Sequence, residues 1–358
     1  MNTGSSESFP KWKSMELPRS VVIGHDAILE TGNVCASLKL GQKGLIVEDS
    51  TTRDIAGKRA DQVLVEAGME VEHHVINEAS LEEVEVAEQA IADFSLDFVL
   101  GVGGGRPIDV AKYSSFNKTI PFVSVPTAAS HDGLVSSQAS LLGPEGKVSI
   151  AARAPIAVIM DTGIIAGSPH RLLAAGCGDI IANSTAVKDW ELAHNLRNEF
   201  YSSYAASLSD MTAEMMIRNA RDLKPGLEES AWFVCKALVS SGVAMSIAGS
   251  SRPASGSEHL FSHALDRIAE KPALHGEQCG VGAIMMMYLH GGDWEEIREA
   301  LLDVGAPATV AAMGIPADKA IEALVHAHEM RSNRYTILGD KGLTYEAAKR
   351  LATATKVI

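Results

Sequence analysis

The sequence has few features of secreted or nucleic-acid-binding proteins. Its four cysteines are widely separated and form no CxxC pair, which argues against a disulfide framework and against a thiolate zinc site. Lysine and arginine number 31 against 45 acidic residues, the formal net charge is −14, and no basic run is long enough to follow a phosphate backbone. The composition therefore argues against nucleic acid as a partner and favours a reducing, cytoplasmic compartment.

Long apolar runs are also missing. The first residues, MNTGSSESFPKWKS, are polar where a secretory signal would need an apolar stretch, and no run elsewhere reaches the length of a membrane span. We expect residues 1–17 to form a disordered tail, and we expect no membrane span. The chain of 358 residues is 46% apolar and 21% charged, which is typical of a globular enzyme with room for two domains.

The character of the sequence changes near residues 162–170. Before this point short β-rich runs alternate with helical stretches, which predicts a parallel sheet covered by helices; the runs are SVVIG, GLIVED, VEHHVI, DFVLGVGGG, PFVSVP and PIAVIMD. SSQASLL and KVSIAA flank the turn GPEG and predict an inserted hairpin. Later segments have helical spacing. We predict an α/β domain over residues 18–165, an all-α domain over residues 166–358, and an active site in the cleft between them.

A glycine-rich loop joins the fourth predicted strand to a helix. The segment DFVLGVGGGRPIDVAK passes through Gly103, Gly104 and Gly105 to Arg106 and Pro107, and proline is favoured in the first helical turn. Glycines let a pyrophosphate approach the main chain closely, and the helix N-terminus adds partial positive charge. The loop departs from the GxGxxG fingerprint, because Arg106 stands in place of the third glycine. It indicates a dinucleotide site, with a tight turn as the alternative.

Polar residues at two other strand ends support a nucleotide site. The turn PTAASHDG follows the fifth predicted run and offers Thr127, Ser130 and Asp132 where open sheets bind ligands. Glu48 and Asp49 end the second predicted strand, where a carboxylate can hold ribose hydroxyls and repel a 2′-phosphate. This placement favours NAD over NADP, and a solvated strand end is the alternative.

Histidines and an aspartate in the second half indicate a metal site. His259 and His263 lie four residues apart in GSEHLFSHALDRIAE, so a helix would place them on one face. His275 follows in LHGEQCG, and Asp179 lies in AAGCGDIIANS. One carboxylate and two imidazoles would leave a position open for substrate or water, as catalytic zinc requires. An ordinary helix face is the alternative explanation of HxxxH.

The motifs GGGRPIDVAK, TAASHD, GCGD, EHLFSH and HGE, in this order and spacing, resemble the archaeal-type sn-glycerol-1-phosphate dehydrogenases over nearly the whole chain. The string SRPASGSEH is the most specific part of the resemblance. The implied fold is dehydroquinate synthase-like, shared with glycerol dehydrogenases, iron-type alcohol dehydrogenases and 3-dehydroquinate synthases. The implied activity is reversible reduction of dihydroxyacetone phosphate by NADH or NADPH. In archaea the product, sn-glycerol 1-phosphate, is the glycerol backbone of the membrane phospholipids.

The resemblance also implies roles for individual residues. One zinc ion per subunit would be held by Asp179, His259 and His275. Asp132, Asp179 and His263 would meet the substrate and act in catalysis. The implied cofactor contacts are Gly103, Gly104, Gly105, Arg106, Pro107, Thr127, Ala128, Ala129, Ser130 and Ser136, to which the strand-end argument adds Asp49. Iron-type relatives have a histidine one helical turn after the aspartate, where this chain has Asn183. That departure favours zinc over iron.

Two roles follow from physical reasoning within this resemblance. His263 is the expected proton relay, because it lies one helical turn from His259. Arg252, just before the EHLFSH helix, would supply positive charge for the substrate phosphate together with that helix's N-terminus, and a structural ion pair is the alternative.

Other functions remain open at this stage. A glycerol dehydrogenase without phosphate specificity and a dehydroquinate synthase would use similar motifs, although SRPASGSEH argues against both. A catalytically silent zinc-binding assembly protein on the same fold is a candidate from another class. For the enzyme we expect a homo-oligomer with a small-molecule substrate.

Overall fold

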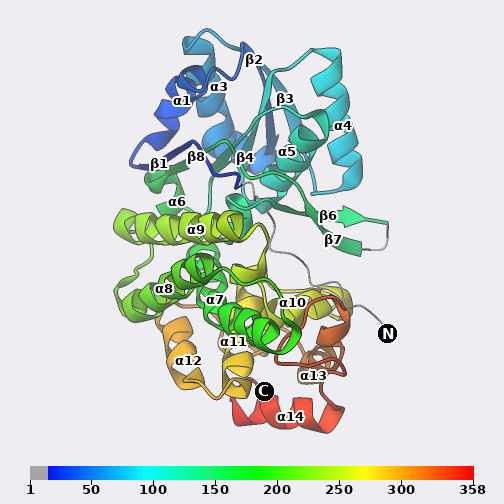
Figure 1. Ribbon diagram of the computed structural model, residues 1–358. Coiled ribbons are helices and arrows are strands. Elements are labelled where there is room, and N and C mark those ends of the chain that lie inside the picture. The colour runs from blue at the N-terminus through cyan, green and yellow to red at the C-terminus, as the bar shows by residue number, and fades with distance from the viewer. Residues whose placement is uncertain (1–14, 145) are drawn as a thin grey trace, which may run out of the picture.

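The computed structural model describes residues 15–144 and 146–358. A sheet with its covering helices forms one end of the molecule, and a group of helices forms the other (Figure 1). Most of the predicted disordered tail, residues 1–14, lies outside the described residues.

The first half of the chain contains a six-stranded sheet with the order β1-β8-β5-β4-β2-β3. Every neighbouring pair in this sheet is parallel. Its strands are β1 (Ser20–Gly24), β2 (Lys43–Asp49), β3 (Glu70–Ile76), β4 (Phe98–Gly103), β5 (Phe122–Pro126) and β8 (Ala157–Asp161). Each strand coincides with one of the predicted runs, so the predicted parallel α/β architecture is confirmed.

Helices cover both faces of the sheet, because successive side chains of a buried strand point to opposite faces. Ile46 of β2 packs in a core with α1 and α3, whereas its neighbours Leu45 and Val47 pack in the core that includes α4 and α5. These helices are α1 (Thr31–Ser37), α3 (Lys58–Glu66), α4 (Leu81–Asp93) and α5 (Gly105–Lys118). The short α2 (Ser50–Thr52) follows β2 directly.

The predicted hairpin is present as β6 (Gln138–Gly143) and β7 (Gly146–Ala151), which pair antiparallel. A fully buried lysine of α5, Lys112, holds its base in place. The Lys112 ammonium donates to the carbonyl of Gly133 at 2.5 Å and to that of Gln138 at 2.6 Å. The hairpin and the turn after β5 are thereby fixed to the same helix.

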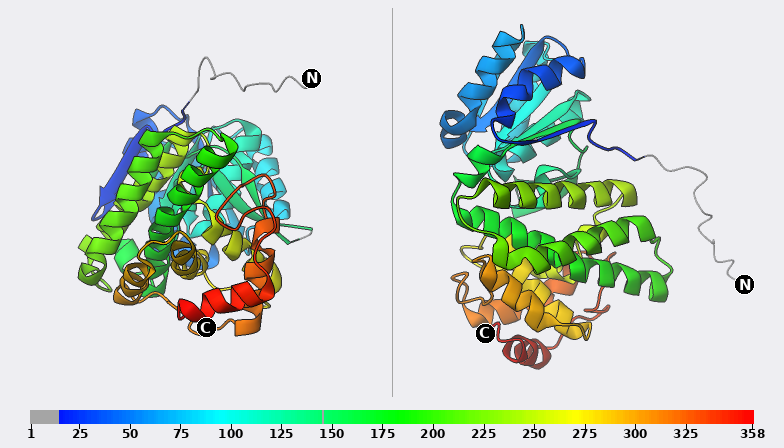
Figure 2. Two further views of the ribbon diagram at one scale, coloured as in Figure 1. Left: turned by 60° about the horizontal axis from the view of Figure 1, so that its bottom comes forward. Right: turned by 90° about the vertical axis from the view of Figure 1, so that its left-hand side faces the viewer.

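The second half of the chain is helical, as predicted, and its helices cross one another beneath the sheet (Figure 2). They are α6 (Thr162–Ala166), α7 (His170–Arg197), α8 (Ser203–Asn219), α9 (Glu228–Ala248), α10 (Ser257–Ile268), α11 (His275–Leu289), α12 (Trp294–Asp303), α13 (Ala317–His326) and α14 (Tyr345–Ala354). The 28-residue α7 runs through this group and contacts α8, α9, α10, α11 and α12.

Among the described residues, α9 alone is long and apolar enough to cross a membrane by length and composition. Within the molecule 56% of its most apolar window is buried, and the helix contacts α6, α7 and α8. The apolar composition of α9 is therefore accounted for by its position between the sheet and the other helices (Figure 1).

Glycines bring the backbones of α7 and α11 into direct contact. A Cβ atom added at Gly276 would lie 1.8 Å from the carbonyl oxygen of Ala175, and one added at Gly178 would lie 2.5 Å from the carbonyl oxygen of Gly276. Both distances are shorter than any side chain tolerates against backbone, so glycine is required at both positions by the close approach of the helices.

We predict that Gly276→Ala lowers the free energy of unfolding by about 1–3 kcal/mol, the usual cost of overpacking a closely packed interior. Equilibrium denaturation of the parent and the variant measures the change. Gly24→Ala is the matched control, because a Cβ at Gly24 meets no atom within 4 Å and its φ is not positive. Equal stability of Gly276→Ala and the parent would show that the two helices can separate without cost.

Candidate active site

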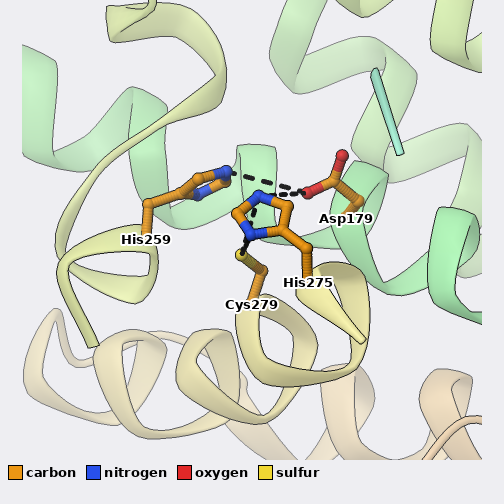
Figure 3. Close-up of side chains that lie close together, drawn as sticks. All are labelled: Asp179, His259, His275 and Cys279. Atoms are coloured by element: carbon orange, nitrogen blue, oxygen red, sulfur yellow. Dashed lines mark hydrogen bonds and ion pairs between the residues drawn. The ribbon is translucent and has the colours of Figure 1, made fainter. Parts of the chain in front are cut away.

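Four side chains from three helices converge where α7, α10 and α11 meet (Figure 3). Asp179 Oδ1 lies 3.7 Å from His259 Nε2 and 3.6 Å from His275 Nε2. Cys279 Sγ lies 3.6 Å from His275 Nε2. One potential ligand atom from each of the four residues lies within 4.8 Å of the others. The structure thus brings together the three residues expected to hold a metal and adds a cysteine.

Hydrogen bonds at the far side of each imidazole set its orientation. His259 Nδ1 lies 2.9 Å from Oε1 of the fully buried Glu258, and His275 Nδ1 lies 3.2 Å from Ser262 Oγ. These contacts leave the Nε2 atoms to face Asp179. A carboxylate or hydroxyl behind a histidine fixes its tautomer in metal sites, so the arrangement fits metal binding.

One carboxylate oxygen of Asp179 has no hydrogen-bond partner. Its Oδ2 accepts from the backbone N–H of Asp132 at 2.9 Å, whereas the buried Oδ1, which faces both imidazoles, accepts none. Burial, together with the charge of Asp132, raises the pKa of Asp179 to about 7. A buried oxygen without a partner is costly unless a cation satisfies it, and the oxygen and nitrogen donors around it suit Zn²⁺.

Asn183, one helical turn after Asp179, lies outside the cluster. Its side-chain amide donates to Ser241 Oγ at 3.1 Å. Asn183 therefore forms a hydrogen bond between α7 and α9.

A cavity of about 1110 Å³ lies between the sheet and the helices. The sheet half lines it with the loop after β4 and the turn after β5, and the helical half lines it with His259, His263 and His275. Gly103 and Pro126 are paired at the ends of β4 and β5, which places the two loops side by side. This volume is slightly above that of ordinary small-molecule sites and suits a dinucleotide together with a small substrate.

The glycine loop presents open backbone to this cavity. Gly103 has a φ of 153°, and a Cβ there would lie 2.8 Å from Pro107 Cγ. A Cβ at Gly104, by contrast, meets no atom within 4 Å, and α5 begins at the next residue. Of the residues expected to contact the cofactor, those lining the cavity are Asp49, Gly104, Gly105, Arg106, Pro107, Thr127, Ala128, Ser130 and Ser136, whereas Gly103 and Ala129 lie behind them.

The two acidic residues at the end of β2 point in different directions. Glu48 is fully buried and its Oε1 lies 2.9 Å from His73 Nδ1, so the expectation that it meets a ribose is wrong. Asp49 lines the cavity, accepts from backbone N–H groups at the start of α2, and lies 3.6 Å from Arg106 Nη2. Strand alternation is the reason, since adjacent side chains point to opposite faces.

Two of the expected substrate residues line the cavity beside the cluster. Asp132 lies next to α9, where its Oδ2 accepts from Ser241 Oγ at 2.7 Å. The ring centroid of His263 lies 6.5 Å from that of His259 and 6.2 Å from that of His275. Burial lowers the pKa of His263 to about 3, which keeps its imidazole neutral at physiological pH.

Arg252 does not face the cavity, and its expected phosphate role requires correction. It is 3% exposed, its guanidinium forms a two-point ion pair with Glu199, and Nη1 donates to the carbonyl of Tyr335 at 2.9 Å. The N-terminus of the following helix is occupied as well, since the N–H of Ser257 donates to Asp189 at 2.6 Å. Arg252 therefore has the alternative role, a structural ion pair with Glu199.

Several residues near the site were missed from the sequence. Cys279 follows His275 by one helical turn, a spacing that would have indicated it. His131 lies in the TAASHD turn and lines the cavity, where burial lowers its pKa to about 3. Arg331 and Lys147 also line the cavity, and no local pattern marks either of them.

Comparison with known proteins identifies the fold and the family of this chain. The family described as iron-containing alcohol dehydrogenase matches residues 22–169. The structure of glycerol dehydrogenase from Schizosaccharomyces pombe superposes with a TM-score of 0.81 at 20% identity, and the match covers 96% of this chain and 90% of that chain. The structure of sulfoacetaldehyde reductase from Bifidobacterium kashiwanohense, in complex with NAD+, superposes with a TM-score of 0.76 at 16% identity. The match covers 96% of this chain and 98% of that chain. These likenesses confirm the predicted dehydroquinate synthase-like fold.

The sequence itself is much closer to one named group. The glycerol-1-phosphate dehydrogenase (NAD(P)+) of Methanosarcina acetivorans is 58% identical over 348 residues, which are 97% of this chain and 97% of that protein. A second relative with the same name, from Methanobrevibacter smithii, is 55% identical over 346 residues, 97% of this chain and 99% of that protein. With this identity over nearly its whole length, the chain belongs to the glycerol-1-phosphate dehydrogenase family.

Proposed function

We propose that this protein is a glycerol-1-phosphate dehydrogenase that reversibly reduces dihydroxyacetone phosphate to sn-glycerol 1-phosphate. It uses NADH or NADPH and one zinc ion per subunit, and its product serves phospholipid synthesis. The observation that carries the proposal is the cavity that joins an open glycine loop to His259 and His275, whose imidazoles lie beside Asp179. The cofactor and the reacting carbonyl would meet inside it.

Asp179, His259 and His275 are the proposed zinc ligands. Bound zinc would act as a Lewis acid and stabilise negative charge on the substrate oxygen. Glu258 and Ser262 hold the two imidazoles from behind, so both rings keep their Nε2 atoms toward Asp179. Cys279 is proposed to pack beside the ligands without binding, because a fourth protein ligand would close the position that substrate needs.

His263 and Asp132 are the proposed substrate partners in the reaction. His263 is neutral and lies next to the ligands, so it can donate a hydrogen bond to the substrate oxygen and relay a proton to it. Asp132 is held by Ser241 and would accept a hydrogen bond from a substrate hydroxyl. Together they would orient the ketone for hydride transfer from the nicotinamide.

We predict that Asp179→Ala, His259→Ala and His275→Ala each lose bound zinc and turnover, because each removes one of three ligands. His263→Ala is expected to keep zinc and lose about 10²-fold or more in kcat, since it removes only the proton relay. Elemental analysis of the purified proteins and steady-state kinetics measure the two effects. Chelation should abolish the parent activity, and added Zn²⁺ should restore it.

Cys279→Ala is the matched control for this set. It removes the remaining member of the cluster and is expected to retain both zinc and turnover. Loss of zinc from Cys279→Ala would contradict the open three-ligand site, and full activity in zinc-free parent protein would contradict a catalytic metal.

The cofactor is proposed to lie over the glycine loop with its pyrophosphate at the start of α5. Support comes from the open face of Gly104 and from the free N–H groups of the first helical turn. Thr127 and Ser130 lie on the neighbouring loop and add hydroxyl donors. Asp49 would bind the ribose of NADH, while the adjacent Arg106 would bind the 2′-phosphate of NADPH.

We predict that Gly104→Val blocks the binding of both cofactors, because the branched side chain would extend into the space needed by the pyrophosphate. Cofactor fluorescence titration measures the affinity. Gly24→Val, at an open position outside the cavity, is the control and should bind normally. Unchanged NADH affinity in Gly104→Val would show that the loop is only a turn.

We predict that Arg106→Ala raises the KM for NADPH about tenfold or more and leaves the KM for NADH within about twofold. The reason is that a hydrogen bond to a charged group contributes about 1.5–3 kcal/mol, and only NADPH carries the 2′-phosphate. Arg59→Ala, at an exposed position on α3, is the control. Equal losses with both cofactors would contradict this assignment.

A cytoplasmic, self-associating enzyme completes the proposal. All four cysteines are free and buried, which suits a reducing compartment. Apolar side chains are exposed along one face of α8, where Tyr204 is 84%, Met211 50% and Met215 48% exposed. Their spacing of seven and four residues supports burial of this face against a second copy of the chain.

A further inference from the structure

Two arginines near the cavity form no salt bridge with a carboxylate of the described residues, although the charges of Glu199 and Glu258 act on one of them, Arg334, from a greater distance. Arg331 and Arg334 follow α13, and among the described residues neither has an acidic group within ion-pair distance. The contrast is with nearby Arg252, whose charge is matched by Glu199. A partly buried cation without a close counter-ion lowers the stability of the fold. The chain contains 45 acidic residues, and none of those described forms a salt bridge with Arg331 or Arg334.

The two guanidiniums are held in place by neutral oxygens. Arg334 donates to the carbonyl of Ser255 at 2.5 Å and to Ser251 Oγ at 2.9 Å, and Arg331 Nη1 lies 3.5 Å from the same Ser251 Oγ. Burial, followed by the charges of Arg331 and Arg252, lowers the pKa of Arg334 to about 9. The two guanidiniums therefore hold two positive charges close together, and a bound anion would stabilise both.

This positive region belongs to the wall of the catalytic cavity. Arg331, Ser251 and Ser255 line the cavity together with His259 and His263. Arg331 therefore lies on the substrate side, near the proposed metal ligands. The glycine loop, where the cofactor pyrophosphate is proposed to bind, belongs to the sheet half.

We propose that Arg331, supported by Ser251 and Arg334, binds the phosphate monoester of the substrate. The inference rests on the proposed function and names the part of the site that recognises the phosphate. A planar guanidinium donates two parallel hydrogen bonds to phosphate oxygens, and the Ser251 hydroxyl adds a third donor. Arg331 would then make the enzyme prefer phosphorylated ketones over unphosphorylated ones. Arg334 would position the Ser251 hydroxyl.

The test compares two ketones in the zinc-loaded enzyme. Arg331→Ala is expected to lower kcat/KM for dihydroxyacetone phosphate roughly 10- to 100-fold, the range that one charge-assisted hydrogen bond corresponds to. The values for dihydroxyacetone, the KM for NADH and the zinc content should stay within about twofold. Arg331→Lys should recover part of the loss, because it keeps the charge without the two-point geometry.

Inorganic phosphate provides a readout that is independent of turnover. With NADH saturating, phosphate should raise the melting temperature of the parent and of Arg59→Ala, a control at an exposed position on α3, but not of Arg331→Ala or Arg331→Gln. Equal phosphate protection in all four proteins would overturn the inference. So would an equal loss for both ketones, or a rise in the KM for NADH.

The parent enzyme separates failure of this inference from failure of the proposed function. If the parent prefers dihydroxyacetone phosphate and Arg331→Ala keeps that preference, only the Arg331 assignment is wrong. If the parent uses both ketones equally well, the proposed function itself is wrong.

Discussion

The backbone contact between α7 and α11 is the constraint on which the site depends. Gly178 and Gly276 leave no side chains between the two helices, and the two proposed ligands are their immediate neighbours in sequence, Asp179 and His275. The glycines that allow the helices to touch thereby carry a carboxylate and an imidazole to a separation of 3.6 Å. His259 completes the arrangement from α10, which packs on α11. The geometry of the proposed metal site is thus a consequence of helix packing, so a change in that packing would alter the distance between Asp179 and His275.

A carboxylate beside the catalytic cavity and a guanidinium in the cavity wall carry opposite charges. At the junction of α7, α10 and α11, Asp179 Oδ1 is buried without a hydrogen-bond partner, and at the edge near α13 Arg331 has no acidic partner among the described residues. Buried groups of this kind are usually paired inside the protein. A cation at the first position and a phosphorylated ketone at the second would satisfy both. The chain has a net charge of −14, so a positive region at Arg331 is unusual for this protein. For this reason it indicates a negatively charged ligand more clearly than the carboxylate indicates a cation.

The errors made from sequence share a physical origin. Arg252 stands beside a recognisable motif, but its side chain pairs with Glu199, whereas Arg331, which lines the cavity beside His263, lies about eighty residues later in the sequence. Glu48 and Asp49 are adjacent in sequence, and only strand alternation decides which one reaches the cavity. Cys279 lies one helical turn after His275, so the two side chains share a helix face, and the spacing between cysteines alone does not show this relation.

By itself the sequence determined the alternation of strands and helices, the position of the glycine loop and the residue types suited to zinc. These features are local, since hydrophobic period, turn composition and helix-face spacing are written within ten to twenty residues. The tertiary structure alone decided which polar groups share a cavity. It turned Arg252 away, brought Arg331 to the wall beside His263, and left Asp179 Oδ1 facing two imidazoles without a partner. Such choices depend on the packing of segments far apart in the chain, and no local pattern encodes the direction in which a single charged side chain will turn.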